Sequence, residues 1–276
     1  MKSAKLAAVF FIVSFAFLSC GQLAKIEKSK DDNFKLAKAE EFYSKKKYRA
    51  AQQLFEGLFP DFKGSEKFED LYYKYAYTFY YLEMYRDAEN MFKGYLEVFP
   101  NSARAEEVDY MRAYSFYKQS PKLELEQVNT IKAMNMLQTF INTHPGSQRN
   151  KEAAELIDLC RKKLEQKEYR TAHMYYNLEK YRAAALAFDA LLTKYPESES
   201  GESYKLMVVK SYYRFANMSI PEKQLERYEK VLTEYEDFAD RYPESKLLKE
   251  AEEYVTLSNQ KIKAIQNEQT ASSAKR

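Results

Sequence analysis

The sequence has no tryptophan, and its 276 residues include two histidines, two cysteines, six glycines and seven prolines. So few turn-forming residues exclude a β-sandwich or a β-barrel, because the many short strands of those folds need frequent breaks. Two isolated histidines cannot supply a closed set of zinc ligands, and no glycine cluster resembles a phosphate-binding loop. The 44 basic and 41 acidic residues leave a formal net charge of +3, so the polybasic surface that nucleic acid needs is missing.

The abundant residues indicate a helical protein that packs a core. Tyrosine occurs 25 times, 45% of the residues are hydrophobic and 31% are charged, which is too rich in packing residues for a disordered chain. His144 is interpreted as a packing or turn residue, and His173 lies in a helical run with no cysteine or carboxylate at the spacing of zinc ligands. No catalytic constellation is visible, so we predict no enzyme activity, no metal and no cofactor apart from a covalent lipid.

Residues 1–19 are typical of an export signal. Lys2 and Lys5 give a positive start, and the following segment 6–18 is apolar except for Ser14. Thirteen residues are too short to cross a hydrocarbon core of about 30 Å, so this segment is not a membrane-spanning helix.

The segment Phe17-Leu18-Ser19-Cys20-Gly21 resembles the lipobox of bacterial lipoproteins. We therefore predict lipidation at Cys20 after cleavage, with residues 20–32 as anchor and tether; an ordinary secretory signal with an incidental cysteine is the alternative. Cys160 would be the remaining thiol, and its helical surroundings predict a small buried side chain.

An internal repeat covers most of the remaining chain. A small residue of each expected second helix serves as its origin: Ala51, Ala88, Ala133, Ala184 and Val231. Large apolar or aromatic residues follow four and seven positions after each origin, and a residue with a ring follows at eleven. Offsets 0, 4, 7 and 11 trace one face of an α-helix, so five copies predict five helix pairs.

The ends of the repeats match as well. Four copies have a proline twelve residues after the origin, where it should stop the second helix: Pro100, Pro145, Pro196 and Pro243. All five copies have a serine at offset fourteen: Ser65, Ser102, Ser147, Ser198 and Ser245. We predict that each serine is the N-cap of the next helix.

The pattern resembles the tetratricopeptide repeat (TPR). Tyr48-Arg-Ala-Ala51, Tyr85-Arg-Asp-Ala88 and Tyr181-Arg-Ala-Ala184 match the opening of its second helix, and Lys47, Met84 and Lys180 replace its usual mid-repeat glycine. The resemblance implies an all-α fold, an α-solenoid of about five TPR-like helix pairs over residues 33–267. A C-terminal capping helix would follow Ser245, and residues 268–276 would form a polar tail.

Seven tyrosines crowd into residues 72–85. A helix turns about 100° per residue, so these rings cannot all face the core. Tyr73, Tyr77, Tyr80 and Tyr81 lie off the apolar stripe and are candidates for a protein-binding surface. The alternative is that they pack between adjacent repeats.

The lipobox, the short tether and the five degenerate repeats together resemble the BamD (ComL/YfiO) family, outer-membrane lipoproteins of the β-barrel assembly machinery. The resemblance extends from about Asp32 to Ile265, and its most distinctive stretch runs from Tyr169 to Ser198. It implies a non-enzymatic scaffold, anchored in the outer membrane and facing the periplasm, that docks on the periplasmic domains of the barrel protein BamA.

The resemblance also implies two binding regions. The N-terminal repeats, with the Tyr73–Tyr81 cluster, would receive unfolded barrel substrates. The C-terminal repeats would hold BamA around Lys210, Arg214, Glu222, Lys223 and Arg227. Two alternatives stay open: another periplasmic TPR adaptor lipoprotein for cell-envelope or division proteins, and a nutrient-binding TPR lipoprotein, which the lack of tryptophan disfavours.

Overall fold

The computed structural model describes residues 23–273, so the predicted signal peptide and Cys20 lie outside the described residues. From Asp32 to Ser273 the chain forms eleven α-helices, and the described residues contain no strand. The helices are α2 (Asp32–Ser44), α3 (Tyr48–Phe62), α4 (Phe68–Tyr81), α5 (Tyr85–Val98), α6 (Ala105–Lys118), α7 (Val128–Thr143), α8 (Asn150–Asn177), α9 (Tyr181–Lys194), α10 (Gly201–Asn217), α11 (Pro221–Arg241) and α12 (Leu248–Ser273). None of them combines the length and the apolar character needed to span a membrane.

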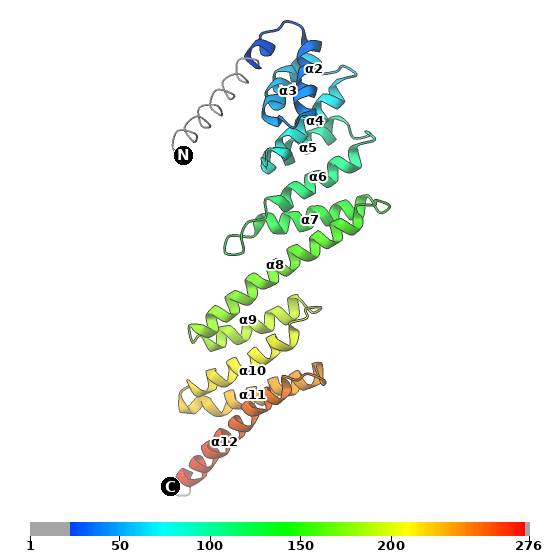
Figure 1. Ribbon diagram of the computed structural model, residues 1–276. Helices are drawn as coiled ribbons and strands as arrows, with labels where there is room; N and C mark the ends of the chain where they lie inside the picture. The colour runs from blue at the N-terminus through cyan, green and yellow to red at the C-terminus, as the bar shows by residue number, and fades with distance from the viewer. Residues whose placement is uncertain (1–22, 274–276) are drawn as a thin grey trace, which may run out of the picture. The chain divides into compact units, whose positions relative to one another are not determined.

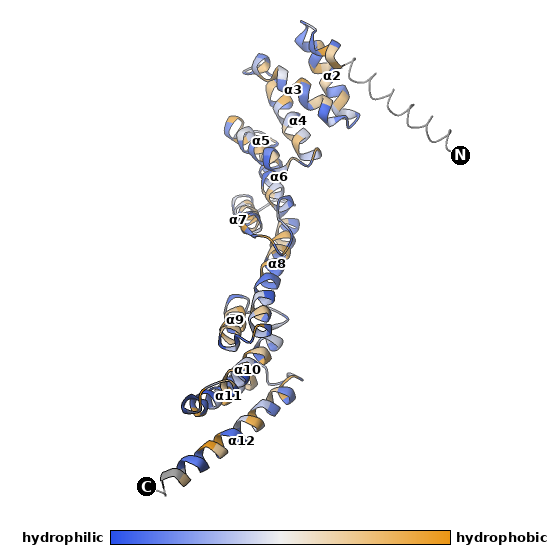
Figure 2. Cartoon of the chain, turned by 90° about the vertical axis from the view of Figure 1, so that its left-hand side faces the viewer, coloured by the Kyte–Doolittle hydropathy of each residue, from blue (hydrophilic) through white to orange (hydrophobic). Residues whose placement is uncertain are grey.

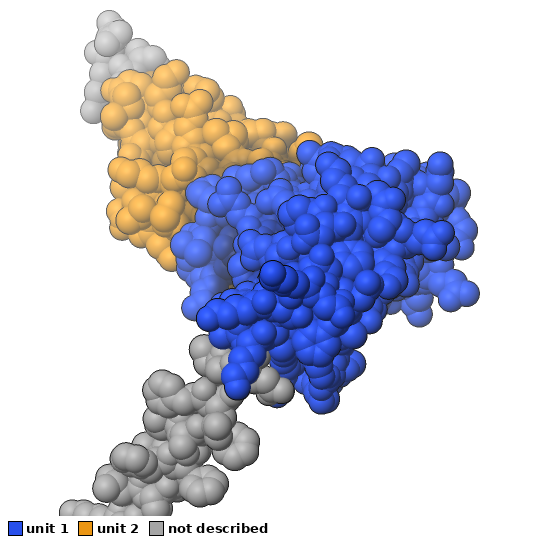
Figure 3. All heavy atoms as spheres, turned by 90° about the horizontal axis from the view of Figure 1, so that it is seen from above, with its two compact units in different colours: residues 1–160 blue, residues 161–276 orange. Residues whose placement is uncertain are grey.

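The chain divides into two units, which are coloured separately in Figure 3. Unit 1 ends at Cys160 and holds α2 to α7 with the first part of α8; unit 2 begins at Arg161 and holds the rest of α8 with α9 to α12. In each unit consecutive helices pack against one another, for example α2 on α3 and α3 on α4, or α10 on α9 and on α11 (Figure 1). This stacking of helix pairs confirms the predicted α-solenoid.

The repeat positions form the core. All five origins, Ala51, Ala88, Ala133, Ala184 and Val231, are fully buried. The side chains seven residues later are buried too: Leu58, Tyr95, Phe140, Leu191 and Phe238. Cys160 is also buried, as its helical surroundings predict. Helix α12 packs on α10 and α11 and is the predicted capping helix, with apolar stretches alternating with hydrophilic ones along its length (Figure 2).

The junctions between repeats end their helices as predicted. Pro100, Pro145, Pro196 and Pro243 each come directly after the C-cap residue of α5, α7, α9 or α11. The C-cap residue Phe99 has φ −127° and ψ 60°, outside the helical region, because a following proline disfavours helical backbone.

The junction serines do not cap the next helix, so that prediction is wrong. The N-caps of α4, α6 and α10 are Lys67, Arg104 and Ser200, each two residues after the serine. In four junctions the serine Oγ instead accepts the backbone N–H two residues on, as Ser102 does from Arg104 at 3.0 Å. The hydroxyl therefore closes a turn before the helix begins.

The same four serines donate to a glutamate at the preceding first helix. Ser102 donates to Glu69 of α4 at 2.6 Å. The equivalent pairs are Ser147 with Glu106, Ser198 with Glu165, and Ser245 with Glu202. We call these links the Ser–Glu staples. In the first repeat Lys67 donates to Asn33 at 2.8 Å at the corresponding place.

The turns within three repeats need a left-handed residue although no glycine is present. Lys46, Glu83 and Glu179 have φ of 57°, 60° and 59°. Glu83 N–H donates to the Tyr80 carbonyl and Met84 N–H donates to the Phe79 carbonyl, which is the Schellman pattern of a helix C-terminus. The residue that replaces the glycine is therefore one position earlier than the sequence comparison placed it.

The ordered helices extend past both expected limits of the solenoid. Residues 23–27 are helical, and Ile26 in the expected tether is buried in the core of unit 1. At the other end α12 continues to Ser273, beyond residue 267.

Candidate protein-binding surfaces

Two of the predicted surface tyrosines connect first helices of neighbouring repeats in unit 1. The hydroxyls of Tyr73 and Tyr77 in α4 both donate to Oε1 of Glu107 in α6, at 3.1 and 2.6 Å. The guanidinium of Arg104 lies 4.4 Å from the centre of the Tyr73 ring. Burial, followed by the hydrogen bond to the Glu107 carboxylate, raises the pKa of Tyr77 well above its ordinary value. With 6% of its surface exposed, Tyr77 acts mainly between repeats.

The other two tyrosines reach the surface. Tyr81 is 43% exposed and stacks on Tyr48 of α3, with ring centres 4.4 Å apart. Tyr80 is half-buried, and its ring lies 5.6 Å from that of Tyr81 and 6.2 Å from that of Tyr114 in α6. Tyr43 of α2 also contacts Tyr48 and Tyr81 through ring edges. We call Tyr43, Tyr48, Tyr80, Tyr81 and Tyr114 the tyrosine surface.

A charged strip lies beside these rings. Lys74 of α4 pairs with Glu40 of α2 at 2.7 Å and with Asp70 at 2.6 Å. Asp70 also accepts from Arg104 at 2.9 Å.

The sequence left open whether the α4 tyrosines pack between repeats or face outward. In the structure Tyr77 lies between repeats and Tyr81 faces outward. Their role in partner binding stays a prediction.

Unit 2 holds a buried cation between α10 and α11. Lys205 is 1% exposed, and its ammonium lies 2.5 Å from Glu234 and 2.5 Å from Asp237. Glu234 also pairs with Lys230 at 2.6 Å, and Asp237 pairs with Arg241 at 2.9 Å. Burial would raise the pKa of Glu234, but the hydrogen bonds from Lys205 and Lys230 outweigh burial and lower it.

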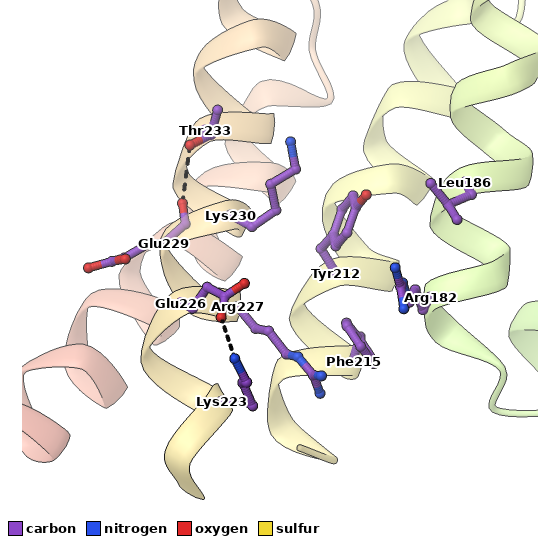
Figure 4. A pocket seen from close by; sticks show the side chains of 10 residues that line it. All are labelled: Arg182, Leu186, Tyr212, Phe215, Lys223, Glu226, Arg227, Glu229, Lys230 and Thr233. Atoms are coloured by element: carbon purple, nitrogen blue, oxygen red, sulfur yellow. Dashed lines mark hydrogen bonds and ion pairs between the residues drawn. The ribbon is translucent and has the colours of Figure 1, made fainter. Parts of the chain in front are cut away.

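A groove of about 510 Å³ opens between α9, α10 and α11 (Figure 4). Its lining combines cationic, aromatic and polar side chains: Arg182, Leu186, Tyr212, Phe215, Lys223, Glu226, Arg227, Glu229, Lys230 and Thr233. The guanidinium of Arg227 lies 4.0 Å from the centre of the Phe215 ring, and Lys223 donates to Glu226 at 3.3 Å. A groove with these groups can bind a segment that carries carboxylates beside apolar side chains.

The predicted docking residues fall into different environments. Lys223 and Arg227 line the groove. Lys210 instead donates to Glu250 of α12 at 2.8 Å, and Arg214 is exposed with its pKa raised by a hydrogen bond to Tyr176. Glu222 is exposed in the first turn of α11.

Sequence reasoning missed the rest of the groove. On α11 the lining residues follow one another at intervals of three or four positions, from Lys223 through Glu226 and Lys230 to Thr233. This spacing places them on one face of the helix and was visible in the sequence. Arg182 and Phe215 come from two other helices, so no spacing within one segment could have found them.

Neither histidine belongs to a recognisable metal site. His144 lies 3.1 Å from Asp109 and packs on the Phe140 ring, and His173 contacts Tyr169 and other rings. Across residues 23–273 no three histidine, cysteine, aspartate or glutamate side chains gather closely enough to hold a metal ion.

A comparison with known families settles which family the sequence falls in. The family model YfiO, described as outer membrane lipoprotein, matches residues 28–218. The chain belongs to the YfiO family. The match includes α2 to α10, and therefore the whole tyrosine surface of this YfiO protein, whereas α11 and α12 lie beyond it.

Other comparisons give weaker likenesses. No curated protein matches this YfiO chain. Among solved structures, the complex of the TPR2AB domain of yeast Sti1 with pHSP90 is 12% identical, with 83% of this chain and 98% of that chain covered and a TM-score of 0.41. A Rap protein complexed with competence and sporulation factor is also 12% identical, with 90% and 80% covered and a TM-score of 0.34.

Proposed function

We propose that the chain is a non-enzymatic scaffold of the outer-membrane β-barrel assembly machinery, which docks on a BamA-like protein and helps to receive unfolded barrel substrates. The observation that carries this proposal is the YfiO match over residues 28–218 of a stacked helical array. An α-solenoid suits a scaffold because its repeated helix pairs offer extended surfaces to partners.

The tyrosine surface of unit 1 is the proposed site for substrates. Unfolded barrel strands carry unpaired backbone groups and alternating apolar side chains, so they aggregate unless they are held. Tyr48 and Tyr81 supply apolar area, and their hydroxyls can pair with backbone groups. Lys74 and Arg104 at the adjacent strip are already paired with carboxylates, so binding there would depend more on ring contacts than on charge.

The groove of unit 2 is the proposed docking site for the periplasmic domains of BamA. Arg182 and Arg227 reach it from α9 and α11 on either side of Phe215 (Figure 4). A BamA-like partner that places an acidic side chain beside an apolar one would satisfy the guanidiniums and cover the ring.

The proposal includes a covalent lipid on Cys20 and an orientation toward the periplasm, with no catalytic residue, metal or other cofactor. Several acyl chains on one cysteine make attachment durable, whereas one chain gives marginal binding. A scaffold held at the membrane raises the local concentration of substrates beside the insertion machinery.

Affinity purification of the full chain from detergent-solubilised membranes tests the proposal. Through a C-terminal tag, we expect a stoichiometric BamA-like barrel protein in the mass spectrum. Cell-wall or division proteins in its place would overturn the assembly role and favour the adaptor alternative.

A pair of charge reversals tests the groove itself. Arg227→Glu should reduce recovery of the barrel protein about tenfold, because it places a like charge against the partner's carboxylate. Lys249→Glu, at an exposed position of α12, is the matched control and should leave recovery unchanged. Equal recovery with both variants would remove the groove from the docking site.

A further inference from the structure

The turns at one edge of unit 2 expose large apolar side chains. Leu178 in the α8–α9 turn is 59% exposed, and Met218 and Ile220 in the α10–α11 turn are 62% and 63% exposed. Both turns lie on the left in Figure 1, and the α9–α10 and α11–α12 turns lie at the opposite edge of the unit. Both turns at this edge of the unit therefore present large apolar side chains to the surroundings.

Cations accompany these apolar side chains. Lys180 and Arg182 follow Leu178, and Arg214 precedes Met218. Within residues 23–273 no carboxylate pairs with any of these three cations. The two turns also carry two acidic residues, Glu179 and Glu222. Three cations against two carboxylates leave the edge with an excess of positive charge. The edge is therefore apolar at its tips and cationic behind them.

We propose that this edge contacts an anionic phospholipid surface, with Leu178, Met218 and Ile220 among the lipid headgroups and with Lys180 and Arg214, which lie outside the groove, beside lipid phosphates. Apolar residues combined with Lys and Arg are what interfacial protein segments use to bind anionic membranes. Half-buried Tyr176 and Tyr181 lie next to the turns, and tyrosine suits the boundary between headgroups and acyl chains.

The arrangement favours a membrane over a protein partner for this edge. The apolar residues stand at the tips of two separate turns, outside the lining of the groove. The chain also belongs to a family of outer-membrane lipoproteins, so a lipid surface is always near. The inference rests on that membership and goes beyond docking to BamA: a second contact would fix how unit 2 is oriented on the membrane, which a single lipid attachment at Cys20 does not.

Fluorescence quenching on vesicles tests the contact with the full-length chain. An environment-sensitive fluorophore is attached through Met218→Cys, and through Glu199→Cys, an exposed control in the α9–α10 turn. The parent protein gives the background, since Cys160 is buried and Cys20 is expected to carry the lipid. The vesicles contain phosphatidylethanolamine with phosphatidylglycerol, or phosphatidylcholine alone, and a nitroxide-labelled lipid as quencher.

On the anionic vesicles we expect at least about twofold stronger quenching at position 218 than at 199, and weaker quenching in high salt. Lys180→Glu should weaken the contact by roughly fivefold or more, since each cation near an anionic surface contributes about that factor. Leu178→Ser combined with Ile220→Ser should bring quenching to the level of the control, and both side chains are exposed enough for the fold to persist.

Two results would overturn the proposal. Equal quenching at 218 and 199 on anionic vesicles would show that the edge does not approach lipid. Protection of 218 from aqueous iodide only after a barrel protein is added would show that a protein covers the edge. Co-purification of the barrel protein with the Leu178→Ser and Ile220→Ser variant reports separately on the docking role.

Discussion

The two units fill one position of the repeat with opposite chemistry. Tyr72 in the second repeat and Lys205 in the fifth each come three residues after the glutamate of a Ser–Glu staple. Each meets the residue six after the repeat origin: the Tyr72 hydroxyl lies against the Gly94 backbone, and the Lys205 ammonium pairs with Asp237. The same helix packing therefore accommodates either of two arrangements. In one, an aromatic ring lies over a glycine; in the other, a lysine pairs with an aspartate.

The two arrangements, the ring over a glycine and the buried ion pair, are destabilised by different kinds of substitution. An aromatic ring needs space, so its partner must be small. A buried ammonium needs anions, and a buried carboxylate needs cations, because an uncompensated charge is costly inside a protein. Unit 1 should therefore respond most to changes in volume, and unit 2 to changes in charge.

Removing the buried cation should have the largest effect. Lys205→Met leaves Glu234 and Asp237 beside an apolar side chain, which should destabilise unit 2 by about 3 kcal/mol. Hydrogen–deuterium exchange of the full chain should then accelerate in α10 and α11, and stay unchanged in α4 and α5. Lys249→Met, at an exposed position of α12, is the matched control. Unchanged exchange in α10 would mean that Lys230 and Arg241 neutralise the carboxylates without Lys205.

Adding one methyl group should damage unit 1. A Cβ at Gly94 would overlap the Tyr72 hydroxyl, whereas the next ring atom, Cζ, lies 3.5 Å away. Gly94→Ala should therefore cost about 2 kcal/mol, and Tyr72→Phe should restore most of that loss. Gly57→Ala is the control, because nothing lies within 4 Å of its Cβ position. Additive effects in the Gly94–Tyr72 double-mutant cycle, measured by urea unfolding, would contradict this account.

Alkaline pH should weaken unit 1 more than unit 2. Burial raises the pKa of Tyr75, Tyr80 and Tyr95 to about 12. A phenol whose folded pKa is raised stabilises the fold at pH values below its unfolded pKa, and this stability is lost between about pH 10 and 12. Raised values occur for ten tyrosines in unit 1 and five in unit 2. As the pH is raised, hydrogen–deuterium exchange in α4 should therefore accelerate before exchange in α10. The reverse order would contradict the prediction that unit 1 is the more sensitive to alkaline pH.

Acid should weaken the buried ion pairs of unit 2. Burial opposes the ionised forms of Glu234 and Asp237, but hydrogen bonds from Lys205 hold both pKa values below their ordinary range. A carboxylate with a lowered pKa contributes stability above its unfolded pKa and loses it as the pH falls through the folded pKa, here below about pH 4. Lys205→Met should remove much of this acid step, and an acid step of full size in the variant would assign it to other carboxylates.

The sequence predicted the features that depend on one helix at a time. The 0, 4, 7 and 11 spacing identified the buried side of the second helices, and the prolines identified where those helices end. The junction serines were interpreted as N-caps because their spacing fits, but the backbone N–H that donates to Ser102 is that of Arg104, before helix α6 begins.

Features that join distant segments could not be predicted from spacing. Lys205 and Lys210 both stand in α10 as single lysines among apolar residues, but one is buried and the other is half-buried. What separates them is the position of Glu234 and Asp237 on α11, about thirty residues later, which only the helix packing brings within reach. The groove has the same origin, since it needs three helices to form.

The smallest predicted effect should be equal in the two units, because it depends on a local turn and not on the core. Glu83 in unit 1 and Glu179 in unit 2 both hold left-handed backbone, which costs a residue with a Cβ about 1–2 kcal/mol. Glycine removes that cost but loses about 0.5–1 kcal/mol through the freedom of the unfolded chain, so Glu83→Gly and Glu179→Gly should each stabilise by about 0.5 kcal/mol. Met84→Gly is the control: its φ is −82°, so glycine there should destabilise. Urea unfolding of the three variants measures the differences, and unequal gains at 83 and 179 would show that the aromatic and ionic cores reach into these turns.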